Sequence, residues 1–348
     1  MKKILIIIAT VGIILTASCA GSDTYIETLP NEEPGTDPYS TVIDNFDLMM
    51  PSGNRVYGMI RRPDPAVYPS LSFAAVVMIP GGIGAGRLAA QGTEAKILAE
   101  SGMVVVCFNA EGRVSNHPED IASEGTEDFN GFRHQDDLAE ILQYVIGLRY
   151  VIPDNVGLST ASYGITMAAG CAGRHPEIPI KYIVDGEGPS SSFVTAHEPW
   201  ALYTPPLHPF HDRYEQVHEL FGHYSIYRDP SSENQAFWAE READKFIGTF
   251  GGRYLRLQAE WDHAQPPSKP AEIPMFDQPP VWWHCKHAAD MINAAVTGGV
   301  PWARVNLAEQ GNAINVTYDA DNQPVYLPGR LADKPWAVLA VLEMARMD

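Results

Sequence analysis

Cysteine is scarce in this sequence, and the 4 that occur lack the spacing of metal ligands. Basic residues are also few. The 24 lysines and arginines face 43 acidic residues, and a net charge of −19 disfavours binding to nucleic acid or anionic lipid surfaces. No G-x-x-x-x-G-K-[ST] loop and no H-E-x-x-H helix occurs, which argues against a nucleotide or zinc site. What remains is a globular composition without a cofactor motif.

The first apolar segment is too short to span a membrane. Two lysines precede the apolar stretch from Ile4 to Leu15, and small residues lead to Cys19. A spanning helix needs about 20 apolar residues, whereas this arrangement is typical of a secretion signal. We expect residues 1–18 to be a signal peptide and Cys19 to be the lipid acceptor of a bacterial lipoprotein, although Thr16 stands where such signals usually carry leucine.

The residues that follow the predicted signal are polar, acidic and contain proline. Such a composition suits a flexible connection, so residues 19–40 are expected to form a lipid-anchored tether. The protein is then exported across the bacterial inner membrane and held at the cell envelope, with residues 41–348 as its folded domain.

From Ala74 onward, short β-branched runs alternate with helical patterns, which indicates a mostly parallel sheet flanked by helices. Leucine and isoleucine at helical spacing predict an amphipathic helix over 136–148. Upstream, Pro51-Ser52-Gly53-Asn54 separates two apolar runs and predicts a β-hairpin. The runs that indicate parallel strands are 74–79, 104–108, 155–159, 180–185, 254–260 and 303–308.

About sixty residues between the sixth and seventh predicted strands break this alternation and are rich in proline, histidine and aromatics. An insertion of this size is more often a cap than a linker, so we expect a cap over about 189–250. Its histidines are irregularly spaced, so no metal site is predicted. Its last part, 234–250, has the pattern of one helix that returns to the sheet.

Ser162 lies where a strand pattern turns into a helix pattern, in NVGLSTASYGITMAAG. A serine at the start of a helix is an ordinary cap. A serine at a strand-to-helix elbow between small residues, here Ala161 and Gly164, is instead a candidate nucleophile. The rest of the chain has to decide between these readings.

Together, four motifs resemble the α/β-hydrolase fold over about Phe46 to Met347: IPGGIG, VVVCFNAEGR, STASYG and LQAEWDHAQPP. The resemblance implies that Ser162 is the nucleophile of a serine hydrolase that needs no cofactor. It also implies an oxyanion hole formed by the backbone N–H of Tyr163 and that of Gly82 or Ile83.

The acid and the base are less well marked. The resemblance places the acid after the strand that follows the cap, which indicates Asp262, while Asp185 and Glu187 after the neighbouring strand are alternatives. The base departs from the family pattern. The last of the 11 histidines is His287, so none follows the final predicted strand, where Gly311 and Asn312 stand instead.

Three explanations stay open for the base. His263 could take the proton, oriented by Glu187 or Asp185. The helix WWHCKHAADMINAA could supply His284 or His287, with Asp262 as its partner. The third explanation is that no base exists and the chain only binds a ligand.

The sequence therefore predicts an exported serine hydrolase that cleaves an ester bond, or less readily an amide bond, through an acyl-enzyme on Ser162. Aromatic residues in the predicted cap suit small or carbohydrate-linked acyl groups. The alternative from another class is a non-catalytic ligand-binding lipoprotein on a hydrolase scaffold. Membrane contact is expected through the anchor on Cys19 alone.

Overall fold

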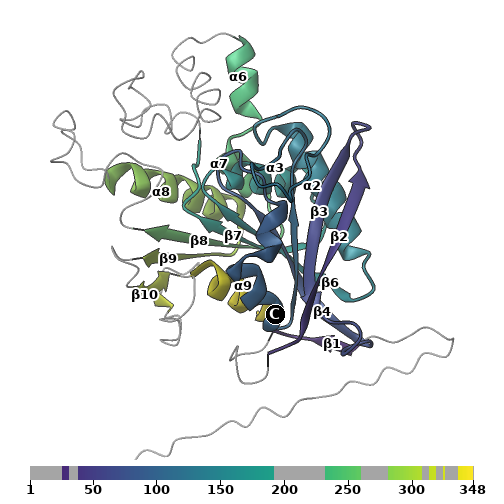
Figure 1. Cartoon of the computed structure of the whole chain (residues 1–348). Helices are drawn as coiled ribbons and strands as arrows, with labels where there is room; N and C mark the ends of the chain where they lie inside the picture. Colours follow the sequence, from purple (N-terminus) through teal and green to yellow (C-terminus); the bar gives the residue numbers. More distant parts are fainter. Residues whose placement is uncertain are drawn as a thin grey trace, which may run out of the picture.

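The computed structural model describes residues 26–30, 38–191, 232–259, 281–307, 313–318, 324–325 and 336–347. Within these ranges the strands form one large sheet, and helices cover both of its faces (Figure 1). The prediction of a mostly parallel α/β sheet is therefore confirmed.

The strand order in the sheet is β11-β10-β9-β8-β7-β6-β4-β5-β3-β2, and β1 pairs with β4. Neighbours from β5 to β9 along this order run parallel, whereas the pairs at the two edges are antiparallel. The strands are β1 (Ile26–Thr28), β2 (Thr41–Met49), β3 (Arg55–Pro63), β4 (Leu71–Ile79), β5 (Met103–Phe108), β6 (Val151–Ala161), β7 (Ile180–Gly186), β8 (Arg253–Ala259), β9 (Trp302–Leu307), β10 (Ala313–Tyr318) and β11 (Pro324–Val325).

The central strands are continuous apolar runs because helices cover both of their faces. Every residue of β5 is buried, and β4 is buried over most of its length. All six predicted parallel strands are present, and the predicted hairpin is formed by β2 and β3, with Met49 opposite Arg55. These elements could be found because burial on both faces leaves an unbroken apolar signal.

The expectation that 303–308 is the last strand is wrong. It corresponds to β9, which is followed by β10 and β11 in antiparallel pairing at the edge of the sheet. In β10, Ile314, Val316 and Tyr318 alternate with polar residues, which is the period of an antiparallel strand rather than of a buried parallel one.

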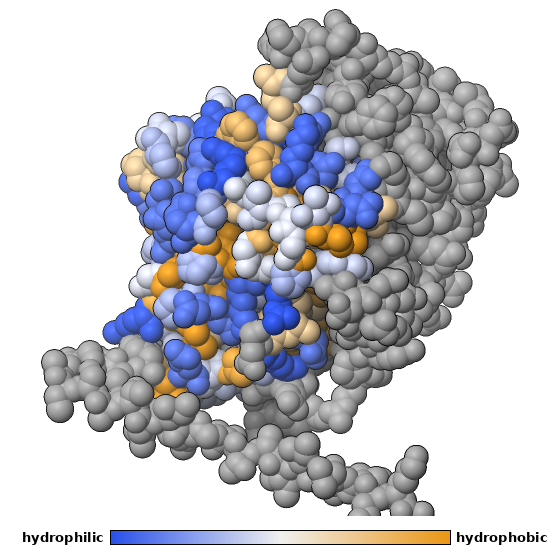
Figure 2. Space-filling view, turned by 180° about the vertical axis from the view of Figure 1, so that it is seen from behind, coloured by the Kyte–Doolittle hydropathy of each residue, from blue (hydrophilic) through white to orange (hydrophobic). Residues whose placement is uncertain are grey.

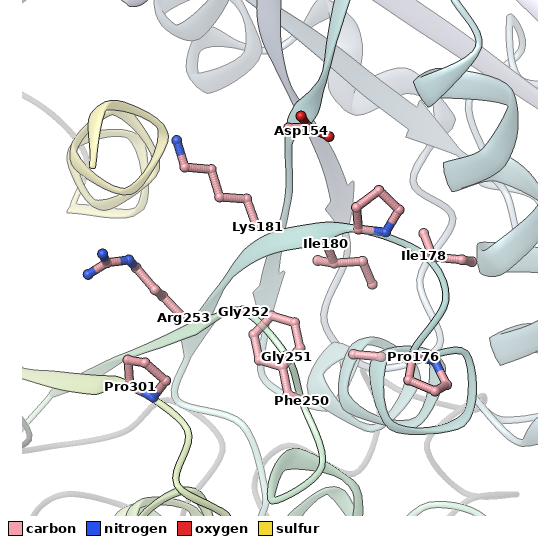
Figure 3. Close-up of a pocket in the computed structure, with 12 residues that line it drawn as sticks. Asp154, Pro176, Ile178, Ile180, Lys181, Phe250, Gly251, Gly252, Arg253 and Pro301 are labelled. Carbon is pink, nitrogen blue, oxygen red and sulfur yellow. The ribbon is translucent and has the colours of Figure 1, made fainter. Parts of the chain in front are cut away.

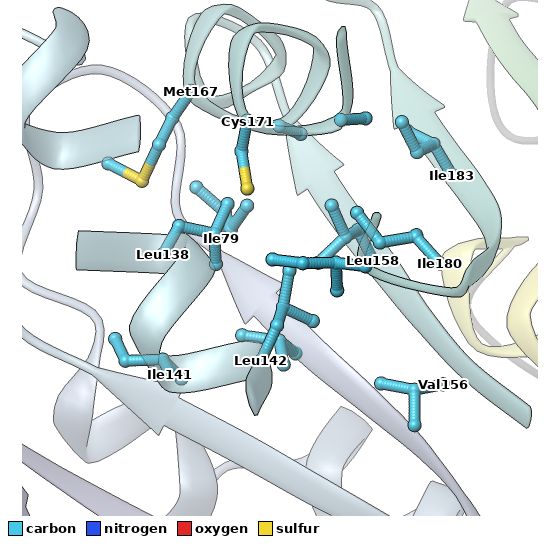
Figure 4. Close-up of a cluster of buried hydrophobic side chains, with 14 of the residues drawn as sticks. Ile79, Leu138, Ile141, Leu142, Val156, Leu158, Met167, Cys171, Ile180 and Ile183 are labelled. Atoms are coloured by element: carbon cyan, nitrogen blue, oxygen red, sulfur yellow. The ribbon is translucent and has the colours of Figure 1, made fainter. Parts of the chain in front are cut away.

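The helices form two layers, one on each face of the sheet (Figure 1). One face of the sheet packs against buried residues of α2, α3, α7 and α8, and the other face packs against buried residues of α1 and α9. Figure 4 shows how α2 and α3 place Leu138, Met167 and Cys171 against the sheet. The helices are η1 (Arg87–Gln91), α1 (Thr93–Glu100), α2 (Phe132–Ile146), α3 (Gly164–Arg174), α6 (Ser232–Ala239), α7 (Ala243–Ile247), α8 (Val281–Gly298) and α9 (Trp336–Arg346).

The single helix predicted over 234–250 is also wrong, because two helices, α6 and α7, share this stretch. The break falls at Arg241, whose buried guanidinium turns inward and donates to the carbonyl of Phe129 at 2.9 Å and to that of Phe237. A tertiary contact has overridden the local helical pattern. Of the predicted cap, residues 192–231 lie outside the described ranges.

On the face seen in Figure 2, hydrophilic residues dominate, and hydrophobic ones form small patches between them. Among the described residues, no helix is both long and apolar enough to cross a membrane.

Candidate active site

Ser162 stands at a strained turn between the end of β6 and the start of α3. Its φ of 48° is in the left-handed region, which residues other than glycine rarely adopt. Its own N–H donates to the carbonyl of Gly186 at the end of β7, at 2.6 Å. Backbone strain of this kind, held by its surroundings, is typical of functional sites. The local geometry is that of the predicted elbow rather than of an ordinary helix cap.

The glycine loop after β4 packs directly against this turn. A methyl group on Gly81 would lie 3.2 Å from Cβ of Ser162, and one on Gly164 would lie 2.7 Å from the carbonyl oxygen of Pro80. Gly82 has a φ of 60°, so the loop bends sharply just beyond that contact. The two motifs that were far apart in the sequence are therefore neighbours in the fold.

Among the described residues, three backbone N–H groups of the glycine loop and the elbow have no hydrogen-bond partner. Within the described ranges, the N–H groups of Gly82, Ile83 and Tyr163 donate to no protein acceptor. Unpaired N–H groups at the N-terminus of a helix attract negative charge. These N–H groups are free to bind an oxyanion, and their predicted role beside Ser162 stays a prediction.

Asp185 is enclosed at the end of β7 and already paired. Its carboxylate accepts from Arg256 at 2.7 Å, from the hydroxyl of Tyr254 at 2.6 Å and from the N–H of Gly188 at 3.0 Å. Both partners of the ion pair are buried, with side chains 1% exposed or less. This carboxylate links β7 to β8. Because it already accepts from three donors, it does not suit the alternative role of orienting a histidine.

Glu187 follows in a left-handed conformation with a φ of 59°, and its N–H donates to the carbonyl of Leu257 at 3.0 Å. It is half-buried, one residue beyond the carbonyl that binds Ser162. Its position at the carboxyl edge of the sheet fits the predicted carboxylate, and that role stays a prediction.

The other predicted acid and base lie beyond the described end of β8. Asp262 and His263 follow Ala259 by a few residues, and β6, β7 and β8 run parallel. The described end of β8 therefore lies at the same sheet edge as Ser162, while Asp262 and His263 themselves lie outside the described residues. Cys19, Gly311 and Asn312 also fall outside the described ranges.

His287 is held in an orientation opposite to that of a triad base. Its Nδ1 accepts from the backbone N–H of Ser190 at 3.0 Å, and the Ser190 hydroxyl lies 3.0 Å from the same atom. An amide N–H can only donate, so in the neutral ring the proton resides on Nε2. A triad histidine instead carries its proton on Nδ1 and accepts through Nε2. The contacts of Nδ1 therefore differ from those of a triad base, and a catalytic role of His287 stays a prediction.

Sequence reasoning missed a buried polar cluster beneath the loop that follows β5. Burial and the nearby Arg113 guanidinium hold the pKa of His134 well below its usual range. Burial and the neighbouring Glu111 raise the pKa of Asp137 to about 8. Asn130 lies in the same cluster and donates to the carbonyl of Tyr163 at 3.0 Å. The Asn-Gly pair at 130–131 was the available signal for a special turn.

A cavity of about 480 Å³ lies at the opposite edge of the sheet. Its lining includes Asp154, Ile180 and Arg253, which stand near the amino ends of β6, β7 and β8 (Figure 3). In Figure 3, Lys181 points toward α9, where its ammonium donates to the carbonyl of Ala345 at 3.2 Å. This cavity is separate from the junction that holds Ser162.

No family model and no curated protein matches the chain. Several solved structures do. A puromycin-hydrolyzing peptidase of Mycobacterium tuberculosis gives a TM-score of 0.53 at 15% identity, over 80% of this chain and 36% of the other. Dipeptidyl peptidase 4 of Porphyromonas gingivalis gives 0.50 at 15%, over 76% and 31%. An acetyl xylan esterase from Paenibacillus sp. R4 gives 0.52 at 14%, over 82% of each chain.

The chain spans about a third of the length of these peptidases but most of the length of the esterase. At such identities the likeness concerns the fold, because one fold hosts many reactions. It agrees with the strand order, with the strained Ser162 elbow and with the glycine loop packed against it. The chain therefore has the α/β-hydrolase fold.

Proposed function

We propose that the protein is an exported serine hydrolase that cleaves an ester bond, and less readily an amide bond, through an acyl-enzyme on Ser162. The observation that carries the proposal is the left-handed conformation of Ser162 between β6 and α3, at a φ of 48°. An elbow of this kind presents the serine oxygen to a substrate. The N–H groups of Gly82, Ile83 and Tyr163, in the adjoining glycine loop and in the elbow, have no partner among the described residues.

The proposed reaction has two halves. Ser162 Oγ attacks the carbonyl carbon while His263 takes the hydroxyl proton, and the N–H groups bind the oxyanion. The bond to the leaving alcohol then breaks as the histidine returns the proton. In the second half, water loses a proton to the same histidine and attacks the acyl carbon, which releases the acid and restores the serine.

The base in this scheme is His263, with Glu187 as the carboxylate that orients it, since Asp185 is already paired with Arg256. The choice over His287 is supported by the bond from the Ser190 N–H to Nδ1, which leaves that ring with the wrong tautomer. No cofactor takes part in the scheme.

The proposed substrates are small or carbohydrate-linked acyl groups. The aromatic residues of the predicted cap suit such groups, and the matched structures include an acetyl xylan esterase over 82% of both chains. Nucleic acid is not a proposed partner, because a net charge of −19 repels it. Export and anchoring through Cys19 are proposed from the N-terminal sequence pattern alone.

One observation favours a second function. His287 is the last histidine in the sequence, and its ring is not oriented as a triad base. If no other histidine reaches Ser162, the chain is a non-catalytic ligand-binding lipoprotein on a hydrolase scaffold.

Labelling with a fluorophosphonate distinguishes these functions, because the reagent reacts only with an activated serine. The wild type, Ser162→Ala and His263→Ala, each without residues 1–19, would be treated and the modified peptide identified by mass spectrometry. We expect the wild type to be labelled on Ser162 and both variants to lose the label. A folded wild type that takes no label would overturn the proposal in favour of ligand binding.

A further inference from the structure

Cα of Tyr163 carries the side chain, the carbonyl group and the backbone nitrogen. The first two of these groups are held in place by hydrogen bonds. Its ring is buried, and its hydroxyl donates to the carbonyl of Phe129 at 3.2 Å. Its own carbonyl accepts from Asn130 Nδ2 at 3.0 Å and from the Thr166 hydroxyl at 2.8 Å. With the side chain and the carbonyl held, Cα and the nitrogen bonded to it are fixed in position, and this nitrogen carries the remaining backbone N–H. That N–H is the proposed oxyanion donor.

Two of these contacts come from a strained turn. Phe129 and Asn130 are consecutive and left-handed, with φ of 50° and 63°. Asparagine tolerates this region, but for a bulky residue such as phenylalanine it is a genuine outlier. The turn brings the Phe129 carbonyl and the Asn130 amide onto Tyr163 together. Strain of this kind persists only where surrounding contacts over-determine the backbone.

The surrounding contacts are present on both sides of the turn. Arg113 donates to Asn130 Oδ1 at 2.7 Å, and Gln135 donates to the Asn130 carbonyl at 3.0 Å. From the chain segment between α6 and α7, Arg241 donates to the Phe129 carbonyl at 2.9 Å. Asn130 is fully buried, so water cannot replace these bonds.

We propose that Asn130 is a positioning residue of the oxyanion hole, which acts by holding the Tyr163 carbonyl and thereby fixing the position of the Tyr163 nitrogen. The proposal rests on the proposed serine hydrolase function. Asn130 touches no reacting atom in this scheme, so its loss should impair transition-state binding and spare substrate binding.

Asn130→Asp is the sharpest test, because it keeps the shape and the oxygen that accepts from Arg113 but removes the donor to Tyr163. Turnover of p-nitrophenyl acetate and the fluorophosphonate labelling rate would be measured. We expect kcat to fall about 10- to 100-fold, less than or comparable to the loss of an oxyanion donor. The labelling rate should fall in parallel, while KM stays within about twofold.

The chain offers a matched control in Asn155→Asp. Asn155 is also buried, at 4% exposure, and its Nδ2 also donates to a backbone carbonyl, that of Ala345 at 2.8 Å. It lies near the amino end of β6, far along the strand from Ser162. The control should lose stability through the same chemical change but keep kcat within about twofold.

The outcomes separate the two proposals. A wild type that hydrolyses the ester and takes the label, together with an Asn130→Asp variant of unchanged kcat, overturns the positioning role alone. A wild type that does neither overturns the hydrolase proposal and this role with it. If Asn130→Asp does not fold, Asn130→Gly carries the test, because glycine tolerates the φ of 63° and also removes the donor to Tyr163. A several-fold loss of kcat at constant KM supports the role, and an unchanged kcat contradicts it.

Discussion

At the residue scale, Asp137 is a carboxyl group in the core, with 1% of its surface exposed. Within the described ranges neither of its oxygens has a hydrogen-bond partner. Burial and the nearby Glu111 raise its pKa to about 8, whereas an unfolded chain gives about 3.9. The folded protein therefore holds a proton there that the unfolded chain releases. Its contribution to stability is complete below about pH 4 and is lost progressively as the pH rises toward 8.

Asp137→Asn removes this titration while it keeps the size of the side chain. The free energy of unfolding of the variant, relative to wild type, should rise by up to about 1.4 kcal/mol for each pH unit between 5 and 8. Urea denaturation at several pH values measures it. Asp136→Asn is the control, because Asp136 is 39% exposed and pairs with Arg174 on the surface. A difference that does not change with pH would refute the assignment.

His287 provides the second prediction at this scale. Asparagine at this position can present an acceptor oxygen to the N–H of Ser190, in place of Nδ1. We expect His287→Asn to keep fluorophosphonate labelling within about threefold of wild type, whereas His287→Ala should lower the melting temperature because a buried N–H loses its acceptor. Abolished labelling in a folded His287→Asn would make this residue the base.

At the element scale, the carboxyl ends of β7 and β8 are joined by the buried pair of Asp185 and Arg256. The same guanidinium donates to the carbonyl of Gly188, so it also shapes the turn that leaves β7. That turn directly follows Gly186, the last residue of β7, whose carbonyl accepts from Ser162. One buried ion pair thus supports both the sheet and the position of the nucleophile.

Arg256→Met should cost about 3–5 kcal/mol of stability, because it leaves Asp185 charged, buried and without its cation. The double variant Asp185→Asn, Arg256→Met removes both charges and should recover much of that loss. Guanidinium denaturation of the two variants and the wild type gives the comparison. Equal losses in the single and double variants would mean that the pairing contributes little.

Elements also show where sequence reasoning succeeds. The runs that became β4 and β5 were predictable because burial on both faces leaves no polar residue to break the pattern. The break at Arg241 was not, since it depends on the Phe129 carbonyl more than a hundred residues away. β10 was missed because its alternating pattern is short and resembles that of a polar loop.

At the scale of the whole molecule, the order of motifs was enough to predict the fold and to place Ser162 beside the glycine loop. The partners of buried charges were not predictable, because a sequence does not say which cation reaches a given carboxylate. No role was predicted for Arg256, yet its guanidinium donates to the carboxylate of Asp185. The tautomer of His287 depends on the N–H of Ser190, in the segment that follows β7, and only the fold reveals this contact.

The proposed anchor gives a prediction for the whole chain. In a bacterial host, the wild type should fractionate with membranes and incorporate radiolabelled palmitate. Cys19→Ser should take up no label and appear in the soluble fraction, because a single transmembrane span is not expected from the apolar stretch at Ile4 to Leu15. Fluorophosphonate labelling should be the same in both. Palmitate incorporation in Cys19→Ser would contradict the assignment of the anchor.

The sheet also separates two thiols. Cys107 belongs to the core beneath α1 and α9, and Cys171 to the core beneath α2 and α3. Both are free and buried, and burial raises the pKa of Cys107 to about 12 and that of Cys171 as well. A thiol reagent can reach each one only when its own helical layer opens. The modification rate of each cysteine therefore reports how often its own helical layer opens. Measured separately for the two cysteine peptides, the rates would compare the opening of the two layers within one molecule.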